Sequence, residues 1–312
     1  MYNVDFLQYA LAKGVGEAAI KKALNFLKLN KNASWKDIIT DKSILKLKDD
    51  IYTNIYKTEN EAKILAEELY NNNVYMILEN DLMYPERLKT TLGNNTPPVI
   101  FVQGNLSLLN KNSIGFCGSR KVSDKGKQIA YECAKELVNN DIAVVSGYAS
   151  GTDLISHMSA LYNNGNTIFV IPEGVLKKRI KGEVKNYLNN TNHVFISQFM
   201  PNLTWNAMNA MRRNKVIIGL SIAMILIESR REGGTFEAGK ETLQLGHKLF
   251  VVDFFHPPET AEANEFFISQ GGIPIKKNKY GHPSMKSVFN SIKNDIVLSK
   301  ENSSESEFDF TY

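Results

Sequence analysis

The sequence predicts an α/β fold: a small helical domain followed by a largely parallel sheet with helices on its faces. From Val74 onward, short apolar runs alternate with amphipathic segments, which is the pattern of βαβ units. Before that point, apolar residues recur near helical spacing through residues 5–70, with Gly14 and Gly16 between two segments. At 312 residues and 43% hydrophobic content, the chain can bury a sizeable core.

The boundaries follow from the same patterns. We expect a helical domain over residues 1–70, a sheet domain over 71–277, and a short helix followed by a disordered acidic tail over 278–312. The expected strands are 74–78, 99–102, 113–117, 142–146, 167–171, 194–197, 223–227 and 249–252. The clearest expected helices are 125–139, 153–162, 209–220, 235–245 and 283–294.

Composition narrows the class of function. Two cysteines and five histidines show no spacing typical of metal ligands, so we expect no metal and no cofactor. A formal charge of +4 favours anionic partners. No signal-peptide pattern and no apolar run of about 20 residues occurs, which predicts a cytoplasmic protein without a membrane partner.

Glycines and cations follow two of the expected strands. In an open parallel sheet, ligands bind beyond the carboxyl ends of the strands. The first strand end carries Gly118, Ser119, Arg120 and Lys121 before a helix; the second carries Gly147 and Gly151. Such loops can cradle a phosphate with backbone N–H groups, although Gly118 and Ser119 also suit a plain turn and helix cap. Neither loop matches the G-x-G-x-x-G or Walker A pattern.

Two further segments add positive charge to the same predicted edge. Cations at the start of a helix oppose its dipole, so the segment 212–215 indicates a bound anion. The segment 228–237 is another basic, glycine-rich loop that leads into a helix. The residues expected to bind phosphate in these two segments are Arg212, Arg213, Asn214, Lys215, Arg230, Gly233, Gly234 and Thr235. With Lys125 and Arg231 nearby, this edge suits a chain of phosphates, as in single-stranded DNA.

Other side chains at these strand ends have two interpretations. Tyr148 and Phe236 could stack on bases, or could pack in the core. Asp153 and His157, four residues apart, could form an acid–base pair; alternatively, the aspartate caps the helix and the histidine packs inside.

Taken in order, these motifs resemble the DNA-processing protein A (DprA/Smf) family, within the wider Smf/LOG Rossmann-like superfamily. The resemblance covers about residues 6–275. It rests on segments 81–88, 97–101 and 104–105, then on Gly118-Ser119-Arg120, Ser146-Gly147 with Gly151, Asp153 and His157, and finally on Arg213-Asn214-Lys215 before Ile217-Ile218-Gly219-Leu220-Ser221.

The resemblance implies a helical SAM-like or HhH-like domain before an extended Rossmann-like core that forms a homodimer. Members bind single-stranded DNA and load a RecA-type recombinase, as in natural transformation, without catalysis. The positions that match the family's DNA contacts are Gly118, Ser119, Arg120, Gly147, Gly151, Arg213, Asn214 and Lys215.

Departures from the family pattern leave an alternative open. Ser150 stands where the family usually has arginine, Ala210-Met211 replaces its Phe-Pro, and Gly233 to Glu237 is only similar to the loop of LOG-type nucleotide phosphoribohydrolases. In a hydrolase, Glu237 would act on the N-glycosidic bond and Arg213 would hold the phosphate; a sensor of nucleotide signals is a related possibility. The acidic, aromatic tail 305–312 could also dock on a partner.

Overall fold

A nine-stranded sheet forms the centre of the computed structural model, which describes residues 3–307. Its order is β1-β2-β6-β5-β4-β3-β7-β8-β9; β1–β2 and β2–β6 are antiparallel, and every other pair is parallel. The strands are β1 (Val74–Leu78), β2 (Val99–Gly104), β3 (Ser113–Cys117), β4 (Ala143–Ser146), β5 (Thr167–Val170), β6 (His193–Ser197), β7 (Ala223–Leu226), β8 (Leu249–Val252) and β9 (Ile273–Ile275). The predicted, mostly parallel sheet is confirmed; the sequence pattern missed only the short β9, which contains Pro274.

The strand order reverses at β3. From β3 the chain adds β4, β5 and β6 on one side, and then returns to add β7, β8 and β9 on the other. Loops that leave the carboxyl ends of β3 and β7 therefore diverge in opposite directions, which opens a crevice between them. In open α/β sheets, ligands bind at a switch point of this kind.

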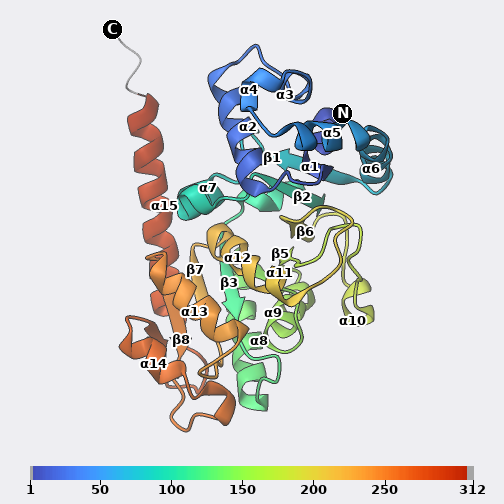
Figure 1. The fold of residues 1–312 in the computed structure, drawn as a ribbon. Helices are drawn as coiled ribbons and strands as arrows, with labels where there is room; N and C mark the ends of the chain where they lie inside the picture. The colour runs from blue at the N-terminus through green and yellow to red at the C-terminus, as the bar shows by residue number, and fades with distance from the viewer. Residues whose placement is uncertain (1–2, 308–312) are drawn as a thin grey trace.

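Helices cover both faces because strand side chains alternate between them. Ile114 and Phe116 face one layer, whereas Cys117 faces the other. The first layer contains α8 (Asp124–Asn139) and α15 (Lys286–Glu307), and α9 (Thr152–Tyr162) packs beside α8. The second contains α7 (Glu86–Leu92), α12 (Asn214–Leu220), α13 (Gly234–Gln244) and α14 (Asn264–Ser269), as Figure 1 shows.

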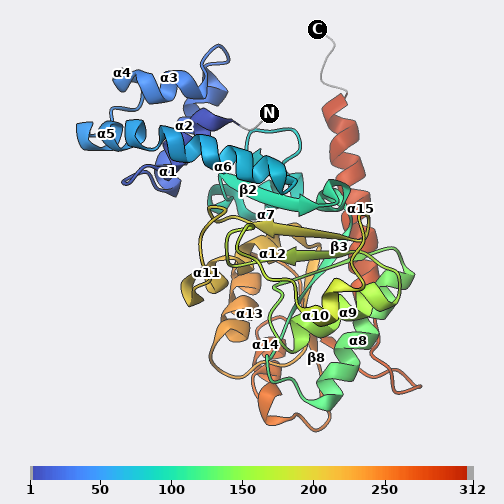
Figure 2. The ribbon, with the colours of Figure 1, turned by 90° about the vertical axis from the view of Figure 1, so that its right-hand side faces the viewer.

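The N-terminal helices form a module at one end of the molecule, beyond β1 and β2 (Figure 2). They are α1 (Val4–Leu11), α2 (Glu17–Leu29), α3 (Trp35–Thr40), α4 (Lys42–Leu45), α5 (Asp49–Lys57) and α6 (Glu59–Asn71). Phe6 and Trp35 meet edge to face inside the module, 5.0 Å apart between ring centroids. The same apolar cluster continues into Val74 and Phe101 of the sheet, so the predicted helical segment packs directly against the antiparallel edge.

The C-terminal helix α15 is longer than the expected helix 283–294. It runs from Lys286 to Glu307, since no glycine or proline interrupts this stretch. The remainder of the expected acidic tail, residues 308–312, lies outside the described residues. Within residues 3–307, no helix has the length and apolar character needed to cross a membrane.

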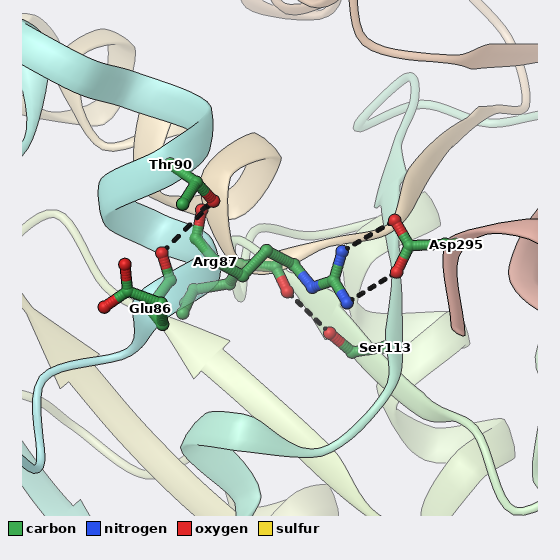
Figure 3. A network of polar contacts seen from close by, with 6 residues as sticks. Glu86, Arg87, Thr90, Ser113 and Asp295 are labelled. Atoms are coloured by element: carbon green, nitrogen blue, oxygen red, sulfur yellow. Dashed lines mark hydrogen bonds and ion pairs between the residues drawn. The ribbon is translucent and has the colours of Figure 1, made fainter. Parts of the chain in front are cut away.

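One bidentate ion pair ties α15 to α7. The two terminal guanidinium nitrogens of Arg87 donate to the two carboxylate oxygens of Asp295 at 3.0 and 2.7 Å (Figure 3). Both side chains are about 30% exposed, so water screens the pair only in part. Figure 3 also shows the Ser113 hydroxyl, which donates to the carbonyl of Leu220 at 2.8 Å and joins β3 to the end of α12.

We expect Arg87→Ala and Asp295→Ala each to lower the free energy of unfolding by about 1 kcal/mol, the scale of a partly exposed, well-oriented pair. A double-mutant cycle in denaturant should show that the double variant loses less than the sum of the two single losses. Fully additive losses would mean that the pair does not hold α15 in solution.

Candidate functional site

Two adjoining cavities lie at the carboxyl ends of the central strands. The larger, here called the central cavity, has a volume of about 410 Å³ and lies at the β3–β7 switch point. The smaller, called the side cavity, has a volume of about 290 Å³ and extends towards the loop after β5. Five residues line both cavities: Arg120, Ala149, Trp205, Ala210 and Arg213. The two spaces are therefore neighbouring compartments of one site.

Arg213 is a buried cation at the centre of this site. It links α11 (Ala207–Arg212) to α12 and is only 6% exposed. Its guanidinium lies against Gly147, where an added Cβ would fall 1.4 Å from Nη1. Within the described chain, no ion pair and no side-chain hydrogen bond to this guanidinium is recorded, and its Nε is buried without a partner.

Burial of Arg213 has an electrostatic cost, and no carboxylate among the described residues forms an ion pair with it within 4.0 Å. Desolvation lowers the pKa of Arg213, and the negative charges of Asp153 and Glu173, which line the central and side cavities, oppose that shift. A guanidinium nevertheless remains protonated in proteins, so a full positive charge faces the cavities. A buried charge without a partner is destabilising, which marks this position as one prepared for an anion.

The glycines of the two predicted nests bring their loops together. Gly151 has φ +75°, and a Cβ there would lie 2.4 Å from the Ser119 carbonyl oxygen. A Cβ on Gly118 would lie 2.3 Å from Oγ1 of Thr152. The backbone N–H of Thr152 donates to the Ser119 carbonyl at 3.2 Å, so both glycines permit close loop packing. Gly118 and Ser119 still line the central cavity; Gly151 does not.

The N-terminus of α8 is not the open phosphate nest that the sequence predicts. Glu228, fully buried just beyond β7, occupies it. Its carboxylate accepts hydrogen bonds from the Ser123 N–H at 2.9 Å, the Ser123 hydroxyl at 2.5 Å and the Thr260 hydroxyl at 2.6 Å. Because a protein carboxylate already interacts with this helix end, an external phosphate is excluded from it.

We expect Glu228→Gln to lower the free energy of unfolding by about 1–3 kcal/mol. Its amide would present an N–H₂ group where the carboxylate now accepts a hydrogen bond. Chemical denaturation measures the loss, and Glu232→Gln is the matched control because that acid is exposed. An equal midpoint for Glu228→Gln and the wild type would contradict this role.

Only some of the expected cations gather at the cavities. Arg120 lines both, and Arg230 lines the central cavity, 3.6 Å from Glu259. Arg212 instead pairs with Glu17 of α2 at 2.7 Å, and Lys215 pairs with Glu241 at 3.4 Å. Lys121, Lys125 and Arg231 line neither cavity; the ammonium of Lys125 lies over the Phe254 ring. The expected cations therefore do not all line the two cavities, and two of those outside them, Arg212 and Lys215, pair with acidic side chains instead.

The structure adds three residues that sequence reasoning missed. Arg179 and Lys181 line the side cavity, and Trp205, 54% exposed, lines both cavities. The sequence did contain a signal, because the basic run 177–181 follows the expected strand 167–171 after the short segment 172–176. The ammonium of Lys181 donates to the Tyr148 carbonyl at 3.1 Å, and burial lowers the pKa of Lys181.

The expected stacking aromatics pack instead. Tyr148 is 9% exposed, and its hydroxyl accepts a hydrogen bond from the Lys181 N–H at 2.7 Å. Phe236 packs against Phe266 and Phe267, with centroid distances of 5.6 and 5.2 Å. Trp205 is therefore the aromatic ring that both cavities expose.

The expected acid–base pair is not formed either. The carboxylate of Asp153 accepts from the Ala149 N–H at 3.2 Å, whereas Nδ1 of His157 lies 2.5 Å from the Thr167 hydroxyl. His157 is fully buried, and desolvation holds its pKa well below its usual value. The histidine therefore packs inside, as the alternative interpretation expected.

The residues of the hydrolase alternative are also separated. Gly234 and Thr235 line the central cavity together with Asn214, whereas Gly233, with φ +90°, precedes α13 outside it. Glu237 is exposed and pairs with Lys240 at 3.0 Å. Because Glu237 does not line the cavity that contains Arg213, the two residues are not arranged around one nucleotide.

The fold and the site define a Rossmann-like protein with a cavity lined by a buried arginine at the strand switch point of an extended sheet. Residues 75–279 match the family model described as DNA recombination-mediator protein A. The chain belongs to this family.

Curated relatives and solved structures agree with that assignment. DNA processing protein DprA of Bacillus subtilis is 30% identical over 172 residues, or 54% of this chain and 57% of that protein. The Streptococcus pneumoniae protein is 29% identical over 160 residues, covering 51% and 56% of the two chains. The matched region thus spans little more than half the length of these relatives.

The solved structure of S. pneumoniae DprA has the same fold, with a TM-score of 0.74 and 22% identity over 88% of this chain and 95% of that one. DNA processing protein A of Helicobacter pylori gives a TM-score of 0.57 at 20% identity, covering 71% of this chain and 96% of that one; that structure concerns the single-stranded DNA binding mode of the H. pylori protein.

Proposed function

We propose that this protein binds single-stranded DNA at the two cavities and assists recombination by loading a RecA-type recombinase, without a chemical step. The observation that carries the proposal is Arg213, a buried guanidinium that lines both cavities and, among the described residues, has no carboxylate within 4.0 Å. The family membership supports it, as does the binding mode described for the H. pylori relative.

The chemistry of the cavities suits a flexible polynucleotide. Arg120, Arg179, Lys181 and Arg213 surround the side cavity, which can hold the phosphates of a strand. Trp205 offers an exposed ring for an unpaired base. Each compartment has the volume of a small-ligand pocket, and a base in a duplex cannot leave its stack to enter one without losing its pairing. We therefore infer a preference for single strands over duplexes.

Homodimerisation and the recombinase partner belong to the same proposal and rest on the family. The absence of catalysis is supported by Glu237, whose carboxylate pairs with Lys240 on the surface of α13. Capture of purified RecA by the DNA-bound protein, together with sedimentation of the free protein, tests these two features.

The central test is Arg213→Met, which removes the charge and keeps much of the side-chain volume. Replacing an unpaired buried charge by an apolar side chain is often neutral or stabilising, so we expect a melting temperature at or above that of the wild type. Affinity for an oligothymidine should fall at least about tenfold, with a shallower salt dependence. Fluorescence anisotropy across a salt series measures both.

Lys57→Ala is the control for net charge, because Lys57 is exposed on α5, in the helical module. It should bind DNA as the wild type does. Full DNA affinity in Arg213→Met would overturn the proposed site. A large loss of stability in that variant would instead show that the guanidinium is structural.

Trp205 should contribute through stacking. We expect Trp205→Ala to weaken binding by about 1–3 kcal/mol at unchanged salt slope, because a ring is lost but no charge is. Trp205→Phe should restore a large part of the affinity. Equal binding by the alanine and phenylalanine variants would show that no base stacks there.

A further inference from the structure

A third cavity, here called the β8–β9 cavity, lies at the carboxyl ends of β8 and β9. Its volume is about 310 Å³, and among the described residues it shares none of its lining with the central or the side cavity. Phe255 lines it and is 89% exposed, so a large apolar ring faces solvent there. The other apolar side chains of its wall are Ile129, Val252, Phe254, Ile275 and Pro283. This wall suits the apolar groups of a ligand.

Lysines add positive charge around the apolar wall. Lys125, Lys276 and Lys277 line the cavity, and all three are exposed. The ammonium of Lys125 lies over the Phe254 ring, 5.2 Å from its centroid. Among the described lining residues, Asp253 is the only acid, and its carboxylate lies 3.9 Å from the Lys276 ammonium. The cavity therefore favours a ligand that joins acidic groups to large apolar ones.

The loops after β7 and β8, which separate this cavity from the central one, carry acidic side chains. Arg230 lies 3.6 Å from Glu259, and the backbone N–H of Arg231 donates to the Glu262 carboxylate at 3.1 Å. Single-stranded DNA also joins negative charge to flat rings, but a strand that passed from one cavity to the other would meet these carboxylates with its phosphates. An acidic peptide fits the β8–β9 cavity better than a strand that continues from the DNA site.

The chain itself contains a segment of that chemistry. Residues 305–312, Glu-Ser-Glu-Phe-Asp-Phe-Thr-Tyr, hold three acids and three aromatic residues in eight positions. The acids complement the three lysines of the β8–β9 cavity, and the aromatic rings complement its apolar wall. Charge and hydrophobicity thus match between this segment and the cavity.

The course of α15 separates this segment from the cavity of its own chain. Pro283 lines the cavity just before α15 begins, and the 22 residues of α15 then rise about 30 Å. Halfway along α15, Asp295 is near His247, which precedes β8: burial lowers the pKa of His247, and the charge of Asp295 opposes that shift. The helix therefore runs towards the amino ends of the strands (Figure 1). Five residues beyond it span at most about 18 Å and cannot return to the cavity.

We propose that the acidic, aromatic segment 305–312 docks in the β8–β9 cavity of a second copy of this chain. Lys276 and Lys277 face its acids, and Phe255 packs against one of its aromatic rings. The contact goes beyond the proposed function, because it joins two protein chains and leaves the central and side cavities open to DNA.

The first test uses a labelled peptide of residues 303–312 and an acceptor protein, the full-length chain with Phe308→Ser and Phe310→Ser, whose own segment should not compete. Fluorescence anisotropy measures binding. We expect the peptide to bind, and a peptide with serine at positions 308, 310 and 312 to bind at least about tenfold more weakly, because it lacks the apolar contacts. Equal binding of the two peptides, or no binding of either, would overturn the proposal.

Changes to the cavity locate the bound peptide. Phe255→Ser together with Lys276→Ala and Lys277→Ala, made in the acceptor, should weaken binding at least about tenfold, and the fold should persist because all three side chains are exposed. Lys57→Ala is the matched control, since it removes an exposed charge from the helical module and should leave binding unchanged. Undiminished binding in the triple variant would show that the peptide docks elsewhere. Displacement of the peptide by oligothymidine would assign the cavity to nucleic acid and refute the inference.

Competition decides whether the contact forms between copies. Unlabelled full-length protein with the same triple change and an intact segment 305–312 offers the segment without the cavity. It should displace the labelled peptide from the acceptor as its concentration rises, whereas added acceptor carrying the triple change should not. If the protein with the intact segment fails to displace the peptide at concentrations at which unlabelled peptide succeeds, the segment does not reach a second copy and the proposal is wrong.

Discussion

The buried guanidinium of Arg213 is the constraint around which the strand ends are arranged. A charge that is 6% exposed and has no carboxylate within 4.0 Å in the described part of the chain costs folding free energy, so the surrounding backbone must hold it in place. Residue 147 has to be glycine, because a Cβ at this position would overlap the guanidinium of Arg213. The next residue, Tyr148, adopts a positive φ of +60°. Backbone strain concentrated beside an unpaired charge is typical of a site that is completed by its ligand.

Glu228 decides where that ligand can bind. In many Rossmann-like proteins, the helix after the first strand offers its N-terminus to a phosphate. Here an internal carboxylate occupies that position and accepts three hydrogen bonds, from Ser123 and Thr260. The positive charge available to an anion therefore lies on the other side of the β3 loop, where Arg120 and Arg213 adjoin both cavities. One buried acid closes the usual site and leaves the neighbouring cationic one open.

The central cavity combines groups that a simple phosphate pocket would not contain. Arg213 and Asp153 are both buried and of opposite charge, yet no ion pair within 4.0 Å joins them within the described chain. Trp205 adds an aromatic surface to the same walls. A nucleotide unit suits the arginine through its phosphate and the indole through its base face, as the proposed function requires.

The sequence by itself determined where the strands lie and that functional residues should be sought at their carboxyl ends. Periodicity located the eight longer strands to within a residue or two, because alternating burial leaves a direct trace in apolar spacing. The rule that ligands bind beyond strand ends brought Arg120 and Gly147 into consideration, and the cations expected at the start of a helix did so for Arg213. Domain limits and the roles of the site residues remain predictions that these patterns motivate.

Only the tertiary structure decided which charges face the two cavities. Arg212 and Arg213 are adjacent in sequence, yet one pairs with Glu17 of a distant helix and the other is buried at the cavities. Glu228 reaches the start of α8 from a strand more than a hundred residues later, and Trp205 enters the site from a loop without a recognisable motif. Ion pairs and helix caps form between segments far apart in the chain, so local composition reveals the charges but not their partners.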